Sequence, residues 1–168
     1  MSRPLRALVA VVGAAVYAVA GGVMGAQNAG WLGAGRDANA LLPILGVGAG
    51  LVVIAARTTL FHEQLRDFPA GRAGGYLAAA GAVLYVVSWL IEFAIFGTLT
   101  LALGLICVAF TFWVRRLGSA IDRALVTLSA IGSLTWNTET TSAFLLVGVG
   151  LIWVVLAVRL LTQERPAG

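Results

Sequence analysis

The sequence contains no lysine, one cysteine and one histidine, and charged residues make up only 11% of its 168 positions. The lone cysteine, Cys107, excludes an intramolecular disulfide and a cysteine-based metal site. The lone histidine, His62, leaves little basis for a catalytic triad or a histidine-based metal site, and without lysine there is no Ser-Lys dyad. We therefore expect a protein that is not an enzyme and that uses neither a cofactor nor a metal.

Hydrophobic residues, by contrast, make up 60% of the chain. A soluble domain carries about a quarter charged residues, and a soluble fold of this size could not cover so much apolar surface. A lipid bilayer is therefore the expected solvent. The formal net charge is +4, but the arginines punctuate apolar runs, which argues against nucleic acid as a partner. Arginine with abundant alanine, glycine and valine is typical of a GC-rich prokaryotic genome.

Six apolar segments each approach the length of about 20 residues that crosses the hydrocarbon core as a helix. These segments are 7–26, 38–56, 76–96, 98–114, 120–136 and 141–158. Their continuous apolar character favours helices, in which every backbone polar group is bonded within the segment, over the alternating strands of a barrel. We predict an all-α, polytopic transmembrane helix bundle with a single integral membrane domain over 1–168.

The arginines set the expected orientation. Threading the six segments back and forth places ten of the eleven arginines on one side of the membrane. The positive-inside rule makes that side cytoplasmic, so we expect both termini in the cytoplasm and a multi-pass protein of the cell (inner or plasma) membrane. Only Arg36, beside Asp37, falls on the outer side.

Two alternatives to this topology stay open. Segment 120–136 is short and rich in hydroxyls, which can bond backbone carbonyls or neighbouring helices. Omitting it leaves five spans but worsens the charge asymmetry, so six are preferred. The first segment could instead be a signal peptide with Ala18-Val19-Ala20 as its cleavage site, although its apolar character continues to Ala26.

Paired in order, the six spans form three helical hairpins. Phe96-Gly97-Thr98 is expected to join the third and fourth spans almost directly, so that these pack antiparallel. The cytoplasmic loop 57–75 is predicted to be either a short amphipathic helix at the membrane surface or an ordinary connector, with Pro69-Ala70-Gly71 ending the helix and Arg72–Gly75 as a flexible lead. Its apolar residues at helical spacing are Leu60, Phe61, Leu65 and Phe68.

A weak internal repeat pattern accompanies these hairpins. Gly46, Gly104 and Gly148 each precede an arginine by eleven residues, which places the pair on one helix face. Either a threefold repeat or coincidence in a glycine-rich chain explains the spacing.

Glu92 is the strongest candidate for a functional residue, because it is the only acidic residue within a predicted span rather than at its end. It is expected near the outer end of the third span. It could be a proton or cation site in an outward-facing cavity, or an interfacial carboxyl paired with Arg36. Ser129, Ser133 and Asn137 form a stripe on the fifth span, which could line the same cavity or join that span to a neighbour.

Two pairs of glycines, Gly21 with Gly25 and Gly46 with Gly50, have the small-xxx-small spacing that allows close helix packing. They predict helix contacts without identifying the partner helix.

Three functions remain open. The preferred one is a non-enzymatic membrane protein that is structural or an accessory subunit of a membrane complex. Its partners would be the lipid bilayer and other membrane subunits or a second copy of itself. The alternative is a small solute or ion transporter or channel that uses Glu92. An enzyme acting on lipid or prenyl substrates is the third, but the clustered acids it usually needs are missing.

Overall fold

The computed structural model describes residues 3–32, 38–56, 65, 67–87, 91–135 and 141–162. Within these ranges the side chains at positions 3, 38, 39, 91–94, 135 and 160–162 are left out of the description. The described residues form six α-helices and two short 3₁₀ helices, with no strand among them. The prediction of an all-α protein is confirmed.

The helices follow in chain order around the molecule. Their bounds are α1 Arg3–Asn28, η1 Ala38–Leu41, α2 Leu42–Ala56, α3 Pro69–Val86, α4 Ile91–Val114, α5 Ala120–Thr135, η3 Thr141–Phe144 and α6 Leu145–Thr162. Four of the six expected segments coincide with a helix to within a few residues, namely those of α1, of η1 with α2, of α5 and of η3 with α6.

The third and fourth helices differ from the expected segments. The α3 helix begins at Pro69 and ends at Val86, and α4 begins at Ile91, so Gly97 lies inside α4 and not in a turn. The segment 69–71, expected to end an amphipathic helix, instead begins α3 with Pro69 in its first turn. Proline suits this position because its missing N–H would have no partner there and its φ is already helical. The loop expected over 57–75 therefore ends at Phe68.

The glycine content of α3 explains why this helix begins earlier in the chain than the sequence predicts. Gly71, Gly74 and Gly75 look like a flexible lead in the sequence, but they are buried residues of the helix. A methyl group built on Gly74 would lie 2.7 Å from the carbonyl oxygen of Gly104 on α4. The cost of glycine in a helix, about 1 kcal/mol each, is offset here by backbone packing between α3 and α4.

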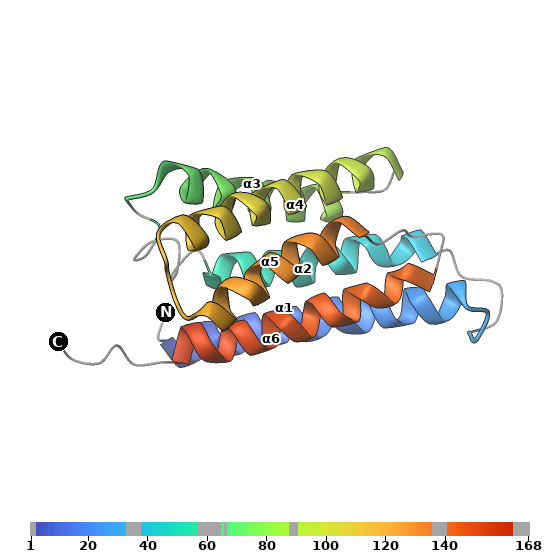
Figure 1. Ribbon diagram of the computed structural model, residues 1–168. Helices are drawn as coiled ribbons and strands as arrows, with labels where there is room; N and C mark the ends of the chain where they lie inside the picture. The colour runs from blue at the N-terminus through green and yellow to red at the C-terminus, as the bar shows by residue number, and fades with distance from the viewer. Residues whose placement is uncertain are drawn as a thin grey trace.

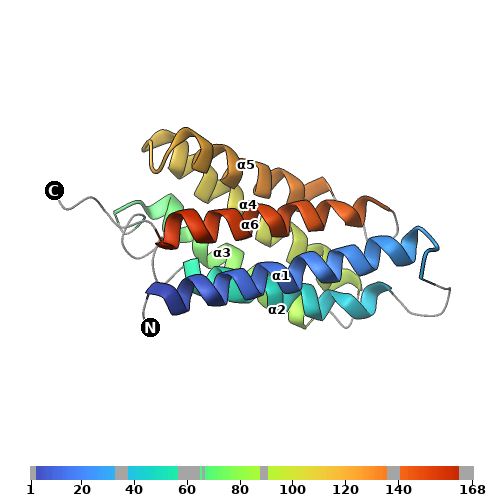
Figure 2. The same ribbon diagram turned by 90° about the horizontal axis from the view of Figure 1, so that it is seen from below.

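The six helices form a closed ring of antiparallel neighbours (Figures 1 and 2). Each helix packs against the next in sequence, and α6 packs against α1 to close the ring. Helices α1, α3 and α5 run in one direction and α2, α4 and α6 return, so that the first residue of α1 and the last of α6 lie at the same end (Figure 1). We call this the basic end, because Arg6, Arg72, Arg115, Arg116, Arg123 and Arg159 lie at it.

Side chains fill the interior of the ring. Tyr17, Tyr85, Leu45 and Leu146 are fully buried in the larger of two apolar clusters. The second cluster includes Leu65 and Phe112 near the basic end. Leu65 belonged to the expected amphipathic segment, and most of that segment lies outside the described residues.

The outward faces of the bundle are also apolar. Val19, Phe110 and Leu151 are exposed by 65%, 63% and 58%. Three helical stretches among the described residues are long and apolar enough to cross a membrane, namely Pro4–Asn28, Ile95–Val114 and Thr141–Arg159, and α2 is apolar but shorter. Large side chains exposed along apolar helices indicate a protein of the membrane.

Candidate functional site

Three of the residues expected to form a polar site cannot be placed by their side chains. Arg36 and Asn137 lie outside the described residues, and only the backbone of Glu92 is described. That backbone lies in the first turn of α4, not near the end of α3 as expected. The difference follows from the earlier end of α3, which moves position 92 onto the returning helix.

The two serines of the predicted stripe are buried in α5. The Ser129 hydroxyl donates to the carbonyl oxygen of Val126 at 2.7 Å, and the Ser133 hydroxyl donates to that of Ser129 at 2.8 Å. Both hydroxyl hydrogens are thus used within their own helix. This back-bonding satisfies a buried polar group without joining α5 to a neighbour.

The four glycines expected at helix contacts lie in different surroundings. Gly21 faces the side chain of Leu146 on α6, and Gly25 faces the ring of Phe144 in η3. A methyl group on Gly46 would lie 2.6 Å from the Cβ of Tyr85 on α3, whereas one on Gly50 would lie 3.9 Å from the nearest side chain. Three of the four are therefore points of close approach, and Gly50 has room for a methyl group.

The three glycines of the internal repeat pattern are not equivalent in the structure. Gly46 faces α3, which belongs to the next hairpin, whereas Gly104 faces α3 within its own hairpin. A methyl group on Gly148 would meet nothing within 4 Å. Equivalent positions of a repeat would share their surroundings, so these three positions give no support to a threefold repeat.

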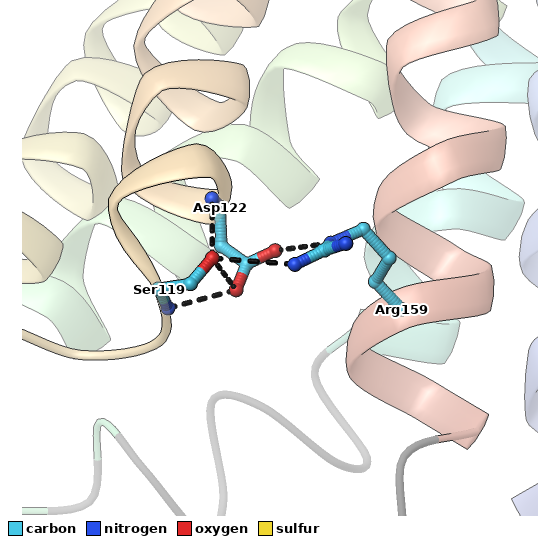
Figure 3. Close-up of polar contacts among 3 residues, drawn as sticks. All are labelled: Ser119, Asp122 and Arg159. Atoms are coloured by element: carbon cyan, nitrogen blue, oxygen red, sulfur yellow. Dashed lines mark hydrogen bonds and ion pairs between the residues drawn. The ribbon is translucent and has the colours of Figure 1, made fainter.

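The best-defined polar site joins α5 to α6 at the basic end (Figure 3). The Arg159 Nε donates to Asp122 Oδ1 at 2.7 Å, and Arg159 Nη2 donates to the Ser119 hydroxyl oxygen at 3.3 Å. Asp122 Oδ2 accepts from the Ser119 backbone N–H at 2.8 Å and from its hydroxyl at 2.7 Å. We call Ser119, Asp122 and Arg159 the α5–α6 clip.

Local sequence explains how the clip forms. Ser119 is the N-cap of α5, since its carbonyl accepts the Arg123 N–H at 3.1 Å and its hydroxyl accepts the Asp122 N–H at 3.2 Å. Serine at the N-cap with an acid three residues later is a capping box, which satisfies two backbone donors reciprocally. Gly118 precedes it with φ +61°, a conformation that glycine adopts without steric cost. Arg159, in the last turn of α6, is favourably placed for the helix dipole.

The electrostatics of the clip lie between those of a surface and a buried ion pair. The Asp122 side chain is 3% exposed and that of Arg159 is 32% exposed. Every carboxylate oxygen has a donor, so the buried charge is compensated. Sequence analysis missed Asp122; its signal was the Ser119-x-x-Asp122 capping pattern, read together with an arginine near the end of an adjacent helix.

A second polar cluster links α4 and α5 at the basic end. The Trp113 Nε1 donates to the Thr127 hydroxyl oxygen at 2.9 Å, and the Arg123 guanidinium carbon lies 5.3 Å from the Trp113 ring centroid. The Thr127 hydroxyl in turn donates to the Arg123 carbonyl at 2.9 Å. The neighbouring Arg115 lies over the ring of Phe68 at 4.5 Å. We call Trp113, Arg123 and Thr127, together with Arg116, whose backbone N–H donates to the Trp113 carbonyl at 3.3 Å, the Trp113 site.

Within the described ranges, no group of three or more histidine, cysteine, aspartate or glutamate side chains could hold a metal ion. No protein-family model matches the chain, and no curated protein or solved structure is significantly similar to it. An interpretation of function therefore depends on the packing of the bundle and on the polar groups at its basic end.

Proposed function

We propose that the chain is a six-span bundle of the cell membrane with a non-enzymatic role, as a structural protein or an accessory subunit of a membrane complex. The observation that supports this most is the packing of the ring. Its interior is filled by large buried side chains such as Tyr17 and Tyr85, and its helices touch backbone to backbone at glycines. A bundle packed in this way is suited to hold a fixed shape in the bilayer.

The direction of the helices supports α5 as a span. Helices α4 and α6 are both candidate spans, and they run in the same direction through the bundle (Figure 1). If both cross the membrane, the chain must cross back between them, and α5 is the helix that lies there. Its 16 residues extend about 24 Å, short of a hydrocarbon core of about 30 Å, and its buried serines are bonded internally.

The same argument from helix direction applies to α2 and α3. They lie between α1 and α4, two candidate spans of opposite direction, so they cross together or not at all. Both lie beside helices that are candidate spans, and α2 is apolar throughout. We infer that both cross, giving six spans. By the positive-inside rule, the arginines of the basic end support a cytoplasmic location for that end and for both termini.

Two matched alanine-to-cysteine substitutions test this topology. Ala40 and Ala120 are both exposed and lie at opposite ends of the bundle. In a Cys107→Ala background, we expect a membrane-impermeant maleimide to label Ala40→Cys in intact cells and Ala120→Cys only after the membrane is opened. Labelling of both from one side would contradict the six-span topology.

The accessory role is tested by particle size. The chain extracted from its native membrane in mild detergent should migrate as a larger particle than the same chain expressed and purified without the other proteins of that membrane. A chain that is monomeric in both preparations would contradict the accessory-subunit form of the proposal.

One observation favours the alternative of transport. The Tyr17 hydroxyl is fully buried in the core and has no hydrogen-bond partner among the described residues. A buried unsatisfied hydroxyl is costly, and it marks a place where water or a polar solute could bind. Its ring packs against Trp153 of α6, with centroids 4.6 Å apart.

Two variants in liposomes separate transport from a structural role. A transporter should lose solute or proton flux in Glu92→Gln and in Tyr17→Phe while both variants still insert. Under the structural proposal the wild type carries no flux, and Tyr17→Phe is as stable as the wild type or gains up to about 1 kcal/mol, because the unpaired hydroxyl is gone. Flux through the wild type that depends on Glu92 would replace the structural proposal by the alternative.

A further inference from the structure

The Trp113 site presents cations that have no carboxylate partner among the described residues. The basic end has six arginines with described side chains and two described carboxylates, those of Asp67 and Asp122, and Asp122 is bound by Arg159. Within the part of the chain that the structure describes, the guanidinium groups of Arg116 and Arg123 form no ion pair or side-chain hydrogen bond, and the Arg123 Nε is buried without an acceptor. Because the Arg123 Nε is covered, the donors within reach of an anion are the Nη groups of Arg123 and the exposed guanidinium of Arg116.

The site is also held in place before any ligand binds. The Leu117 N–H donates to the Phe112 carbonyl at 3.0 Å, and the Arg116 N–H donates to the Trp113 carbonyl at 3.3 Å, which is the Schellman pattern at a helix C-terminus. The Arg123 guanidinium rests on the Trp113 ring. Stacking on an aromatic face leaves the in-plane N–H groups of arginine free for bidentate bonds to a phosphate.

Arg116 occupies the position in this turn where glycine is usual. Its φ is +52°, and it is the one described non-glycine residue with positive φ. An L-residue is destabilised in this conformation relative to glycine. The turn thus holds a guanidinium at a position where a side chain carries a conformational cost.

Apolar surface continues from these cations toward the bilayer. Trp113 is 51% exposed, as expected for an indole at the membrane interface. Phe110 lies one turn further from the basic end than Trp113 on α4, and Ile131 lies one turn beyond Thr127 on α5. Phe110 is 63% exposed and Ile131 is 52% exposed. The two arginines offer positive charge to a phosphate, and the exposed apolar side chains on α4 and α5 offer surface to acyl chains.

We propose that the Trp113 site binds the phosphate ester of an anionic glycerophospholipid, with Arg123 and Arg116 as its cations and the acyl chains along α4 and α5. The inference rests on the membrane location proposed above. The contact with an aromatic ring distinguishes Arg123 from Arg72, an exposed arginine at the start of α3 that contacts no ring among the described residues.

The experiment titrates purified protein in neutral detergent with phosphatidylglycerol or with phosphatidylcholine of the same acyl chains, and counts retained lipid by native mass spectrometry. Two arginines near the membrane surface should favour the anionic lipid by about thirtyfold. Arg123→Gln should reduce that preference about fivefold, whereas the control Arg72→Gln, which leaves the Trp113 site intact, should reduce it by much less. An equal loss in the control, or no preference in the wild type, would overturn the proposal.

Arg116→Gly separates binding from folding. It removes a cation and relieves the positive φ, so lipid preference should fall about fivefold while the unfolding equilibrium shifts about fivefold toward the folded state. A purely structural arginine would not change the two measurements in opposite directions, and a variant that keeps its lipid preference contradicts the proposal. Displacement of the lipid by inorganic phosphate would assign the site to the free anion and overturn the lipid as ligand.

Incorporation of the wild type into phosphatidylcholine nanodiscs tests the membrane location separately. Failure to incorporate would overturn both this inference and the proposed function. Incorporation without a preference for phosphatidylglycerol would overturn this inference alone.

Discussion

The contact between α3 and α4 and the contacts of α5 are built in different ways. Between α3 and α4, glycines bring the backbones together: methyl groups on Gly81 and Gly104 would overlap backbone atoms of the facing helix. Helix α5 has one comparable position, Gly132, where the nearest atom is a side-chain methyl of Val149. Its other described attachments include two polar groups, the α5–α6 clip and the Trp113 site.

This difference shows two ways of holding helices together where lipid is the solvent. Burial of apolar surface drives little association between helices in a bilayer, because lipid tails are as apolar as leucine. Close backbone packing and polar contacts must supply the stability instead. The α3–α4 pair depends on shape, so any added atom should be harmful, whereas α5 depends on groups that can be removed one at a time.

The largest effect is expected from adding a methyl group to α4 where it faces α3. In Gly104→Ala the new Cβ would overlap the Ala78 nitrogen and lie 2.6 Å from the Gly74 carbonyl oxygen. Both obstacles are backbone atoms, so the helices must separate, at a cost of about 3 kcal/mol in the free energy of unfolding. Unfolding in mixed micelles followed by circular dichroism measures this cost.

Gly148→Ala is the matched control, because its methyl group meets nothing within 4 Å. It should be neutral or stabilising by up to about 1 kcal/mol, since alanine is the better helix former. Equal losses in both variants would show that glycine itself, not close packing, is needed, and the comparison between the two regions would fail.

A smaller loss is expected from breaking the α5–α6 clip. Asp122→Ala removes a nearly buried carboxylate together with the capping bond at Ser119, and should cost about 2 kcal/mol. Arg159→Gln keeps the cap and should cost about 1 kcal/mol, because the arginine is one-third exposed.

The double variant measures the coupling of these two residues. If the ion pair is the shared interaction, the loss in the double variant should be smaller than the sum of the two single losses by about 1 kcal/mol. Strict additivity would show that Asp122 acts through the cap alone, and that α5 is not tied to α6 by charge.

The sequence was sufficient to predict the helical class, because long apolar runs carry that information directly. It failed at the boundary between α3 and α4. Gly71, Gly74 and Gly97 have the local preferences of turns, but their role is to let two helices approach closely. That role depends on the facing helix, which no local pattern of the chain describes.

The candidate site was predictable only in part. The buried serines of α5 were identified, but whether Ser133 bonds to its own helix or to a neighbour depends on geometry. The α5–α6 clip joins residues separated by 37 positions. A capping pattern fixes Ser119 and Asp122 locally, whereas the proximity of Arg159 follows from the closure of the ring.

The smallest effect is expected from removing the buried hydroxyl of Ser133 on α5. Ser133 is 1% exposed, yet its hydroxyl bonds only to the Ser129 carbonyl of the same helix. Ser133→Ala removes that bond but gains helix propensity, so the free energy of unfolding should change by less than about 0.5 kcal/mol. A loss above about 1.5 kcal/mol, as expected when a buried hydrogen bond between elements leaves a partner unsatisfied, would mean that Ser133 joins α5 to another helix. Helix α5 would then be held through its buried face as well as at its basic end, and the contrast with α3 and α4 would lose its basis.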